Sequence, residues 1–131
     1  MIFVDTSFWV AAASARDDHH AEAVELFARH AVDGLVISNH VRGETWTFLN
    51  RRYGHRVAVD FLDRLERARL RLVLVDGELE NEALRWLRRH GERPYSFVDG
   101  TSFALMRSLR IREALAFDGD FAAAGFVELR S

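Results

Sequence analysis

The chain is organised around the stretch Tyr95-Ser-Phe-Val-Asp-Gly-Thr-Ser-Phe-Ala-Leu-Met106. From Phe97 to Leu109 the residues are nearly all apolar, which predicts a helix that is hydrophobic on most sides and therefore buried. Asp99 lies in this helix, on the same face as Phe103 and Met106. An unpaired buried charge is costly, so the Asp99 carboxyl either has a partner or is protonated.

Two interpretations of Asp99 are open. Ser96 precedes the helix at an N-cap position, and Asp99 follows three residues later, where a capping box usually carries Glu or Gln. In the first interpretation Asp99 only caps its helix. In the second it belongs to an acidic cluster, and the other members must come from elsewhere in the chain.

Length and composition indicate one globular domain over residues 1–131, with nearly half of its residues apolar. There is no cysteine, which excludes disulfides and thiolate metal sites. The net charge is −2 and all 18 basic residues are arginine, so a mechanism that needs a lysine is excluded. The first residues lack the pattern of a signal peptide, and no apolar run could span a bilayer. We therefore expect a cytoplasmic protein with no membrane segment.

Apolar patterns predict five short strands separated by helices. The predicted strands are Ile2–Val4, Leu35–Ile37, Leu72–Val75, Glu113–Phe117 and Phe126–Leu129. The first predicted helix is Phe8–Ala13, and the second is capped at Asp17-Asp18 and has an apolar stripe at Val24, Phe27, Ala28 and Ala31. In the third predicted helix the residues that face inward are Val41, Thr45, Phe48 and Leu49. A fourth helix is predicted around Phe61, a fifth around Trp86, the buried helix from Phe97, and a helical turn at Phe121–Ala124. Strands that alternate with helices indicate an α/β fold, with a central, mainly parallel β-sheet flanked by helices on both faces.

Three carboxylates are placed by this topology at one edge of the sheet. Asp5 and Asp118 follow strands directly, and the functional crevice of an open parallel sheet lies outside the carboxyl ends of its strands. Glu44 lies in the first turns of the helix after the second strand, which brings it to the same edge. The rule does not place Asp99, because its helix follows another helix and so need not begin at the carboxyl edge of the sheet. Like charges this close favour a hard divalent cation between them, Mg²⁺ or Mn²⁺.

Several other residues could assist such a site. Thr6, Ser96 and Thr101 place hydroxyls beside the predicted ligands, although each could equally be an ordinary cap or turn residue. Asp120 is either an outer ligand or the N-cap of the turn at Phe121. Gly100 weakens an apolar helix by about 1 kcal/mol relative to alanine, which indicates close packing near the site.

Other acidic or metal-dependent sites fit the sequence less well. The histidines have no partners at ligand spacing, so a zinc site is not predicted. A phosphotransfer receiver domain needs a lysine, which the chain lacks. A haloacid-dehalogenase-type phosphatase needs an aspartate two residues after its nucleophile, and Ser7 stands there after Asp5.

With these residues identified, the sequence resembles PIN-domain ribonucleases, and within that family the VapC-type toxins of toxin–antitoxin pairs. The resemblance covers the whole chain and is carried by four segments: Ile2-Phe-Val-Asp-Thr-Ser7, Ile37-Ser-Asn-His-Val-Arg-Gly-Glu-Thr45, Tyr95 to Met106, and Ala116-Phe-Asp-Gly-Asp-Phe121. Four acidic positions in this order and spacing are a strong signal, whereas any one segment is weak.

The resemblance implies a metal-dependent endoribonuclease. Asp5, Glu44, Asp99 and Asp118 would hold one or two Mg²⁺ or Mn²⁺ ions, and an activated water would attack an RNA phosphodiester. It further implies a homodimer and a VapB-like antitoxin that blocks the site. The alternative is a catalytically silent PIN-fold module that only binds a partner. The arginines that could follow RNA phosphates, which the sequence does not rank, are Arg42, Arg51, Arg52, Arg107 and Arg112.

Overall fold

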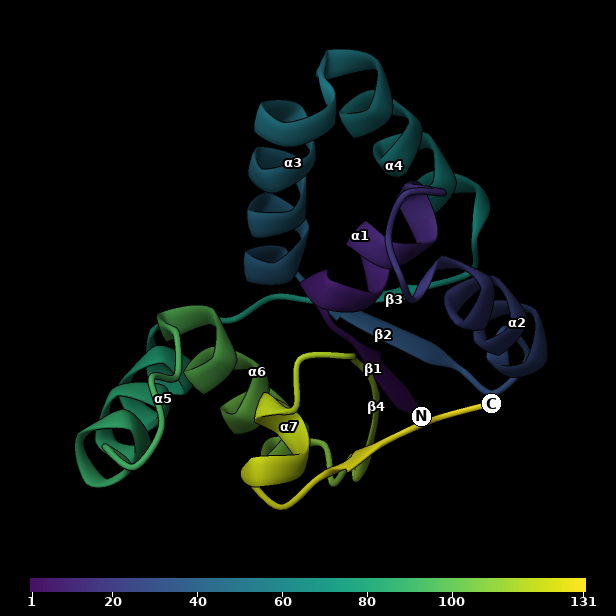
Figure 1. Ribbon diagram of the computed structural model, residues 1–131. Coiled ribbons are helices and arrows are strands. Elements are labelled where there is room, and N and C mark those ends of the chain that lie inside the picture. Colours follow the sequence, from purple (N-terminus) through teal and green to yellow (C-terminus); the bar gives the residue numbers. More distant parts are fainter.

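Five parallel strands form one sheet at the centre of the computed structural model, which describes residues 1–131 (Figure 1). The strands are β1 (Ile2–Val4), β2 (Leu35–Ser38), β3 (Arg71–Val73), β4 (Glu113–Leu115) and β5 (Val127–Glu128). They lie in the order β3-β2-β1-β4-β5, and every neighbouring pair is parallel. In the central strand, Phe3 lies opposite Val36 of β2 and Ala114 of β4. Because all the strands run the same way, their carboxyl ends share one edge.

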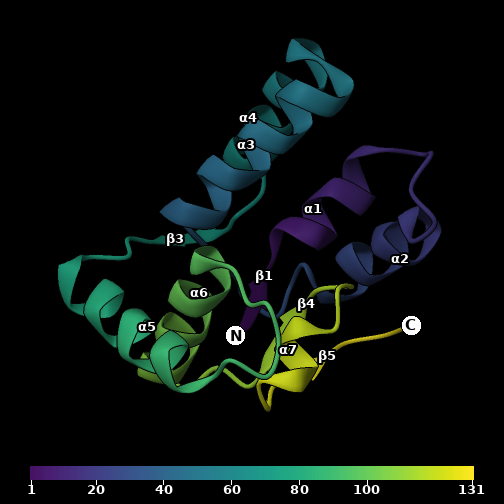
Figure 2. The same cartoon turned by 60° about the vertical axis from the view of Figure 1, so that its left-hand side comes forward.

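Seven helices surround the sheet. They are α1 (Thr6–Ala13), α2 (His20–His30), α3 (Asn39–Tyr53), α4 (His55–Arg67), α5 (Gly77–Arg89), α6 (Phe97–Ser108) and α7 (Asp120–Ala123). Helices α1 and α2 lie on one side of the sheet, and α5 and α6 lie on the other (Figures 1 and 2). Helices α3 and α4 form a hairpin that projects away from the sheet (Figure 2). The predicted α/β architecture with helices on both faces is confirmed.

Helix α6 is the buried helix that the central stretch predicted. All its residues from Asp99 to Met106 are buried, and Phe103 packs edge-on against Trp86 of α5. A Cβ atom added at Gly100 would lie 2.8 Å from Cδ1 of Leu87. Glycine at this position therefore lets α6 approach α5 closely. This contact fixes where the amino end of α6, and with it Asp99, lies in the fold.

For two helices, the prediction of which residues face the core was partly wrong. In α2 the buried side chains are Ala23 and Leu26, whereas Val24 is half exposed. Helix α2 begins after His19, whose backbone N–H donates to Asp17, so Asp17 lies before the cap rather than at it. In α3, Val41, Thr45 and Leu49 face inward as predicted, but Phe48 is 42% exposed.

The strand limits also differ from the predictions. Strand β3 begins one residue earlier and ends at Val73, and β4 ends at Leu115 because Phe117 belongs to the loop beyond it. Helix α1 begins at Thr6, directly after the Asp5 cap. None of the helices is both long and apolar enough to cross a membrane.

Candidate active site

Asp5 is the first residue after the central strand and is buried at the carboxyl edge of the sheet. Its Oδ2 accepts hydrogen bonds from the Ser7 backbone N–H at 3.1 Å and from the Ser7 hydroxyl at 2.7 Å, so Asp5 also caps α1. The Ser7 hydroxyl oxygen accepts a bond of 3.0 Å from the backbone N–H of Phe117, in the loop after β4. Ser7 therefore ties the Asp5 carboxylate to the segment that carries Asp118.

Glu44 reaches the same edge from the second turn of α3. The Thr6 hydroxyl donates to Glu44 Oε1 at 2.6 Å, and the buried Thr45 hydroxyl donates to Thr6 at 3.2 Å. This chain of hydroxyls fixes one oxygen of the Glu44 carboxylate. The other oxygen, Oε2, forms no hydrogen bond within the protein and is available to a ligand.

Both interpretations of Asp99 hold at once. Its Oδ2 accepts a bond of 3.0 Å from the Ser96 backbone N–H, and its own N–H donates to the Ser96 hydroxyl at 2.9 Å, which completes a capping box. One of its carboxylate oxygens also lies within 4.8 Å of an oxygen from each of Asp118 and Asp120. The capping bonds hold the side chain still, and in that position it takes part in an acidic cluster.

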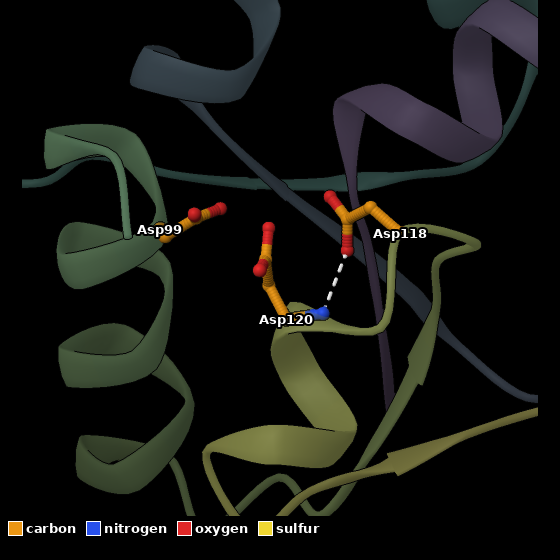
Figure 3. Close-up of side chains that lie close together, drawn as sticks. All are labelled: Asp99, Asp118 and Asp120. Carbon is orange, nitrogen blue, oxygen red and sulfur yellow. Dashed lines mark hydrogen bonds between the residues drawn. The ribbon is translucent and has the colours of Figure 1, made fainter. Parts of the chain in front are cut away.

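Asp118, in the loop between β4 and α7, and Asp120, the first residue of α7, complete the cluster. The backbone N–H of Asp120 donates to Asp118 Oδ1 at 3.1 Å. Figure 3 shows the Asp99, Asp118 and Asp120 side chains reaching into a common space between α6 and this loop. The N-cap of α7 is Gly119, so Asp120 is not a cap, and its carboxylate is instead one of the three that lie together.

A buried glutamate in β5 holds this loop in shape. The Glu128 side chain is 4% exposed and accepts hydrogen bonds from three backbone N–H groups of the loop and of α7. Its Oε1 accepts from Gly119 at 3.3 Å, and its Oε2 accepts from Phe121 and Ala122, each at 3.1 Å. Arg130 forms an ion pair with the same carboxylate at 3.0 Å. Glu128 does not line the cavity, but it fixes the backbone that carries Asp118 and Asp120.

One arginine contacts the cluster directly. The Arg93 Nε donates to Asp120 Oδ1 at 2.6 Å, and its Nη2 donates to the backbone carbonyl of Asp118 at 3.1 Å. The pKa of Arg93 is raised, first because of the hydrogen bond to Asp120. Arg93 therefore balances one of the negative charges, that of Asp120.

These side chains line a cavity of about 480 Å³ that contains six carboxyl groups. The carboxyl groups belong to Asp5, Asp17, Glu44, Asp99, Asp118 and Asp120. Burial, and after it the neighbouring charge of Asp118, raises the pKa of Asp5 to about 8. Burial also raises the pKa of Asp99 to about 6 and raises the pKa of Asp118. In the absence of a cation, some of these groups therefore keep a proton near neutral pH.

The residues fit a hard divalent cation. Apart from the His19 imidazole, every side-chain donor that lines the cavity is an oxygen, and the oxygens of Asp99, Asp118 and Asp120 are close enough to share one ion. A bound cation would offset the burial and the mutual repulsion that raise the pKa values of Asp5, Asp99 and Asp118. Asp5 and Glu44 line the same cavity and could supply further oxygens or hold ligand water.

The three predicted supporting hydroxyls separate into two groups. Thr6 and Ser96 line the cavity, and they orient Glu44 and Asp99 respectively. Thr101 is fully buried, donates to the backbone carbonyl of Val98 at 2.9 Å, and does not line the cavity. Thr101 thus satisfies the backbone of its own helix, as serine and threonine often do.

Sequence reasoning missed Ser7, Arg93 and Glu128. Ser7 could have been found, because it lies two residues after an N-capping aspartate and can hydrogen-bond back to it. Arg93 and Glu128 carry no local signal. Their partners lie in a loop whose conformation the sequence pattern does not specify.

Comparison with known proteins supports this fold. The PIN-domain family model matches residues 2–127. The 23S rRNA-specific endonuclease VapC20, from two strains of Mycobacterium tuberculosis, is 55% identical over 130 residues, which are 99% of this chain and 98% of the relative. The crystal structure of M. tuberculosis VapC20, described as a sarcin–ricin loop cleaving toxin, superposes with a TM-score of 0.94 over 100% of both chains, at 55% identity.

Proposed function

The chain belongs to the PIN-domain family, and we propose that it is a metal-dependent endoribonuclease of the VapC toxin type. The observation that carries the proposal is the convergence of Asp5, Glu44, Asp99 and Asp118 in one cavity, each from a different part of the fold. Asp120 is a further candidate ligand. The identity of 55% to an rRNA-specific endonuclease over nearly the whole chain supports the same activity.

In this proposal each carboxylate has a role set by its surroundings. Asp99, Asp118 and Asp120 would hold Mg²⁺ or Mn²⁺, because their oxygens lie closest together. Asp5, fixed by Ser7, would supply a further oxygen to the cation or orient a water molecule. Glu44, with one oxygen fixed by Thr6 and the other free, would accept a hydrogen bond from an attacking water. A bound cation would supply charge neutralisation and a more acidic water.

For the substrate we propose the sarcin–ricin loop of 23S rRNA, the target that the names of the VapC20 relatives give for those proteins. The corresponding partners would be a VapB-like antitoxin and a second copy of the chain in a homodimer. A protein that acts on rRNA would work in the cytoplasm.

The test uses a synthetic RNA hairpin with the sarcin–ricin loop sequence and a second hairpin with a scrambled loop. Purified protein should cut the first hairpin at one position in Mn²⁺ and leave it intact in EDTA. Asp5→Asn should abolish cleavage. The matched control, Asp63→Asn, changes an exposed carboxylate on α4 and should cut like the wild type.

The outcomes separate the alternatives. Cleavage of both hairpins would retain the nuclease and reject the proposed target. Cleavage that persists in Asp5→Asn would come from a contaminant. If the wild type binds Mn²⁺ and RNA but cuts neither hairpin, the chain is a silent PIN-fold binding module.

A further inference from the structure

A second hollow opens beside the acidic cavity, along the face of α3 that looks towards α6. We call it the α3 groove; it has a volume of about 760 Å³ and is lined chiefly by His40, Gly43, Glu44, Thr47, Phe48 and Arg51. Glu44 and Phe48 line both the groove and the acidic cavity. The two hollows therefore adjoin at these two side chains.

We propose that the α3 groove binds the RNA nucleotide next to the scissile phosphate, with a base stacked on Phe48 and a backbone phosphate on Arg51. The inference rests on the proposed ribonuclease function and names the part of the site that holds its substrate. Such binding requires an aromatic ring, a cationic side chain without an ion-pair partner, and open space. The ring must lie between Glu44 and the cation.

Phe48 supplies the aromatic face. Its side chain is 42% exposed, although α3 has an inward face formed by Val41, Thr45 and Leu49 that buries apolar side chains. Phe48 stacks with no other aromatic ring of the protein. An exposed phenylalanine beside a phosphodiester-cleaving site suits a nucleobase, because every base offers a flat surface for stacking.

Arg51 supplies the cation. It is exposed, and neither it nor Arg52, which also lines the groove, forms an ion pair. Arg51 follows Glu44 by seven residues, so it lies on nearly the same helix face and about 10 Å further along the axis. Phe48 lies between them, about 6 Å from Glu44 along that axis. The order carboxylate, aromatic ring, arginine is the order that a strand leaving the acidic cavity needs.

Gly43 supplies the open space. Glycine destabilises a helix interior relative to alanine, so it usually has a local reason. At Gly100 the reason is close packing, but a Cβ atom at Gly43 would meet no atom within 4 Å. The missing side chain instead keeps the floor of the groove open.

The other arginines that could follow RNA phosphates are less suited to this role. Arg42 lines a separate apolar hollow with Leu62 and Leu65. The Arg107 guanidinium lies over the Trp86 ring at 5.4 Å, and burial lowers its pKa. Arg112 precedes β4 and therefore lies at the amino edge of the sheet, opposite the acidic cavity.

The first measurement is RNA binding in the Asp5→Asn background, which keeps the sarcin–ricin hairpin intact. Anisotropy of the labelled hairpin should show binding weakened between about fivefold and a hundredfold by Phe48→Ala. Phe48→Trp should bind like the parent, whereas Phe48→Leu should be as weak as Phe48→Ala, because only an aromatic ring stacks. Arg51→Gln should make the slope of log affinity against log salt shallower by about 0.7. The matched controls, Leu84→Ala and Arg88→Ala on α5, should bind normally.

Gly43→Leu tests the space alone. The added side chain enters open volume and improves helix propensity, so the unfolding temperature should not fall. RNA binding should nevertheless weaken, because the side chain fills the groove. A Gly43→Leu protein that unfolds normally and binds RNA like the parent would overturn the inference.

Failure of the groove and failure of the ribonuclease are distinguishable. If the wild type cuts the hairpin and the Phe48 and Arg51 variants bind and cut like the α5 controls, the groove is rejected and the ribonuclease stands. If the hairpin binds through Phe48 and Arg51 but is never cut, the groove stands and the ribonuclease is rejected. If these variants bind RNA normally but change the molar mass seen by light scattering, the groove is an interface between copies of the chain. If they instead bind RNA normally and lose affinity for an acidic peptide, its ligand is a protein.

Discussion

Replacing Asp5 by Asn should stabilise the metal-free protein at pH 8. Burial and the neighbouring Asp118 raise the pKa of Asp5 from 3.8 to about 8, so ionising this group in the folded state is unfavourable. Asparagine is uncharged and caps a helix about as well as aspartate, so the bonds from Ser7 can be kept. The substitution removes the electrostatic cost and leaves the local structure in place.

The sign and size of the change in stability follow from the pKa values of Asp5 in the unfolded and the folded protein. Between pH 4 and pH 8 the unfolded Asp5 is ionised while the folded Asp5 keeps its proton, so unfolding releases a proton and stability falls as pH rises through this window. Each pKa unit corresponds to 1.36 kcal/mol, which gives an upper limit of about 6 kcal/mol for the full shift. Water entry and the desolvated Asn amide reduce the gain to about 1–3 kcal/mol. For a chain of this length that raises the unfolding temperature by about 4 °C per kcal/mol.

The assay is thermal unfolding by circular dichroism in EDTA at pH 5 and pH 8. The wild type should lose stability between these pH values, Asp5→Asn should lose less, and the exposed control Asp63→Asn should follow the wild type. In Mn²⁺ the order at pH 8 should reverse, because only the wild type gains the full stabilisation from the bound ion. An Asp5→Asn protein that is less stable than the wild type in EDTA at pH 8 would refute the reasoning.

Two further substitutions test how the site is held in place. Glu128→Gln replaces one acceptor oxygen by a donor and so leaves at least one of the three backbone N–H groups unpaired, at a cost of about 1–3 kcal/mol. We expect kcat for the hairpin and the affinity for Mn²⁺ to fall about tenfold or more, while RNA binding is retained. An unchanged kcat would contradict the role of Glu128. Gly100→Ala places a Cβ atom 2.8 Å from Leu87 and should cost about 1–3 kcal/mol in urea unfolding. Combining it with Leu87→Ala should cost less than the sum of the single changes, and strict additivity would contradict the steric explanation.

The sequence alone was enough to place Asp5, Glu44 and Asp118, because their positions depend only on where strands end. In a parallel sheet every strand ends at the same edge, so a residue that follows a strand is located by topology. Asp99 depends on a different kind of information. Its helix follows α5, and the direction of a helix after another helix is set by packing, here by the approach of α6 to Leu87 at Gly100.

Glu128 shows why other parts of the site could not be predicted. The sequence places it in a strand that ends the chain, with no hint of a binding role. Its partners are backbone N–H groups, which every residue has, and only the turn at Gly119, with φ of 82°, aims them at one carboxylate. The face of α2 was predicted wrongly for a similar reason, since Val24 and Leu26 suggest two different stripes and only tertiary packing selects Leu26.

Helix α3 combines the two charges that an RNA-cleaving site needs. Its amino end, which carries the partial positive charge of the helix, holds Glu44 in its second turn, and its last turn holds Arg51 and Arg52. Each arginine in the last turn is favourable for the helix itself by a few tenths of a kcal/mol, so the helix dipole alone could explain the arginines. It does not explain Gly43, where an added Cβ atom would meet no atom within 4 Å, or the exposed Phe48 between the two charges. Gly43 lowers the stability of the helix and Phe48 leaves apolar surface exposed, and the nucleotide proposed for the α3 groove would account for both.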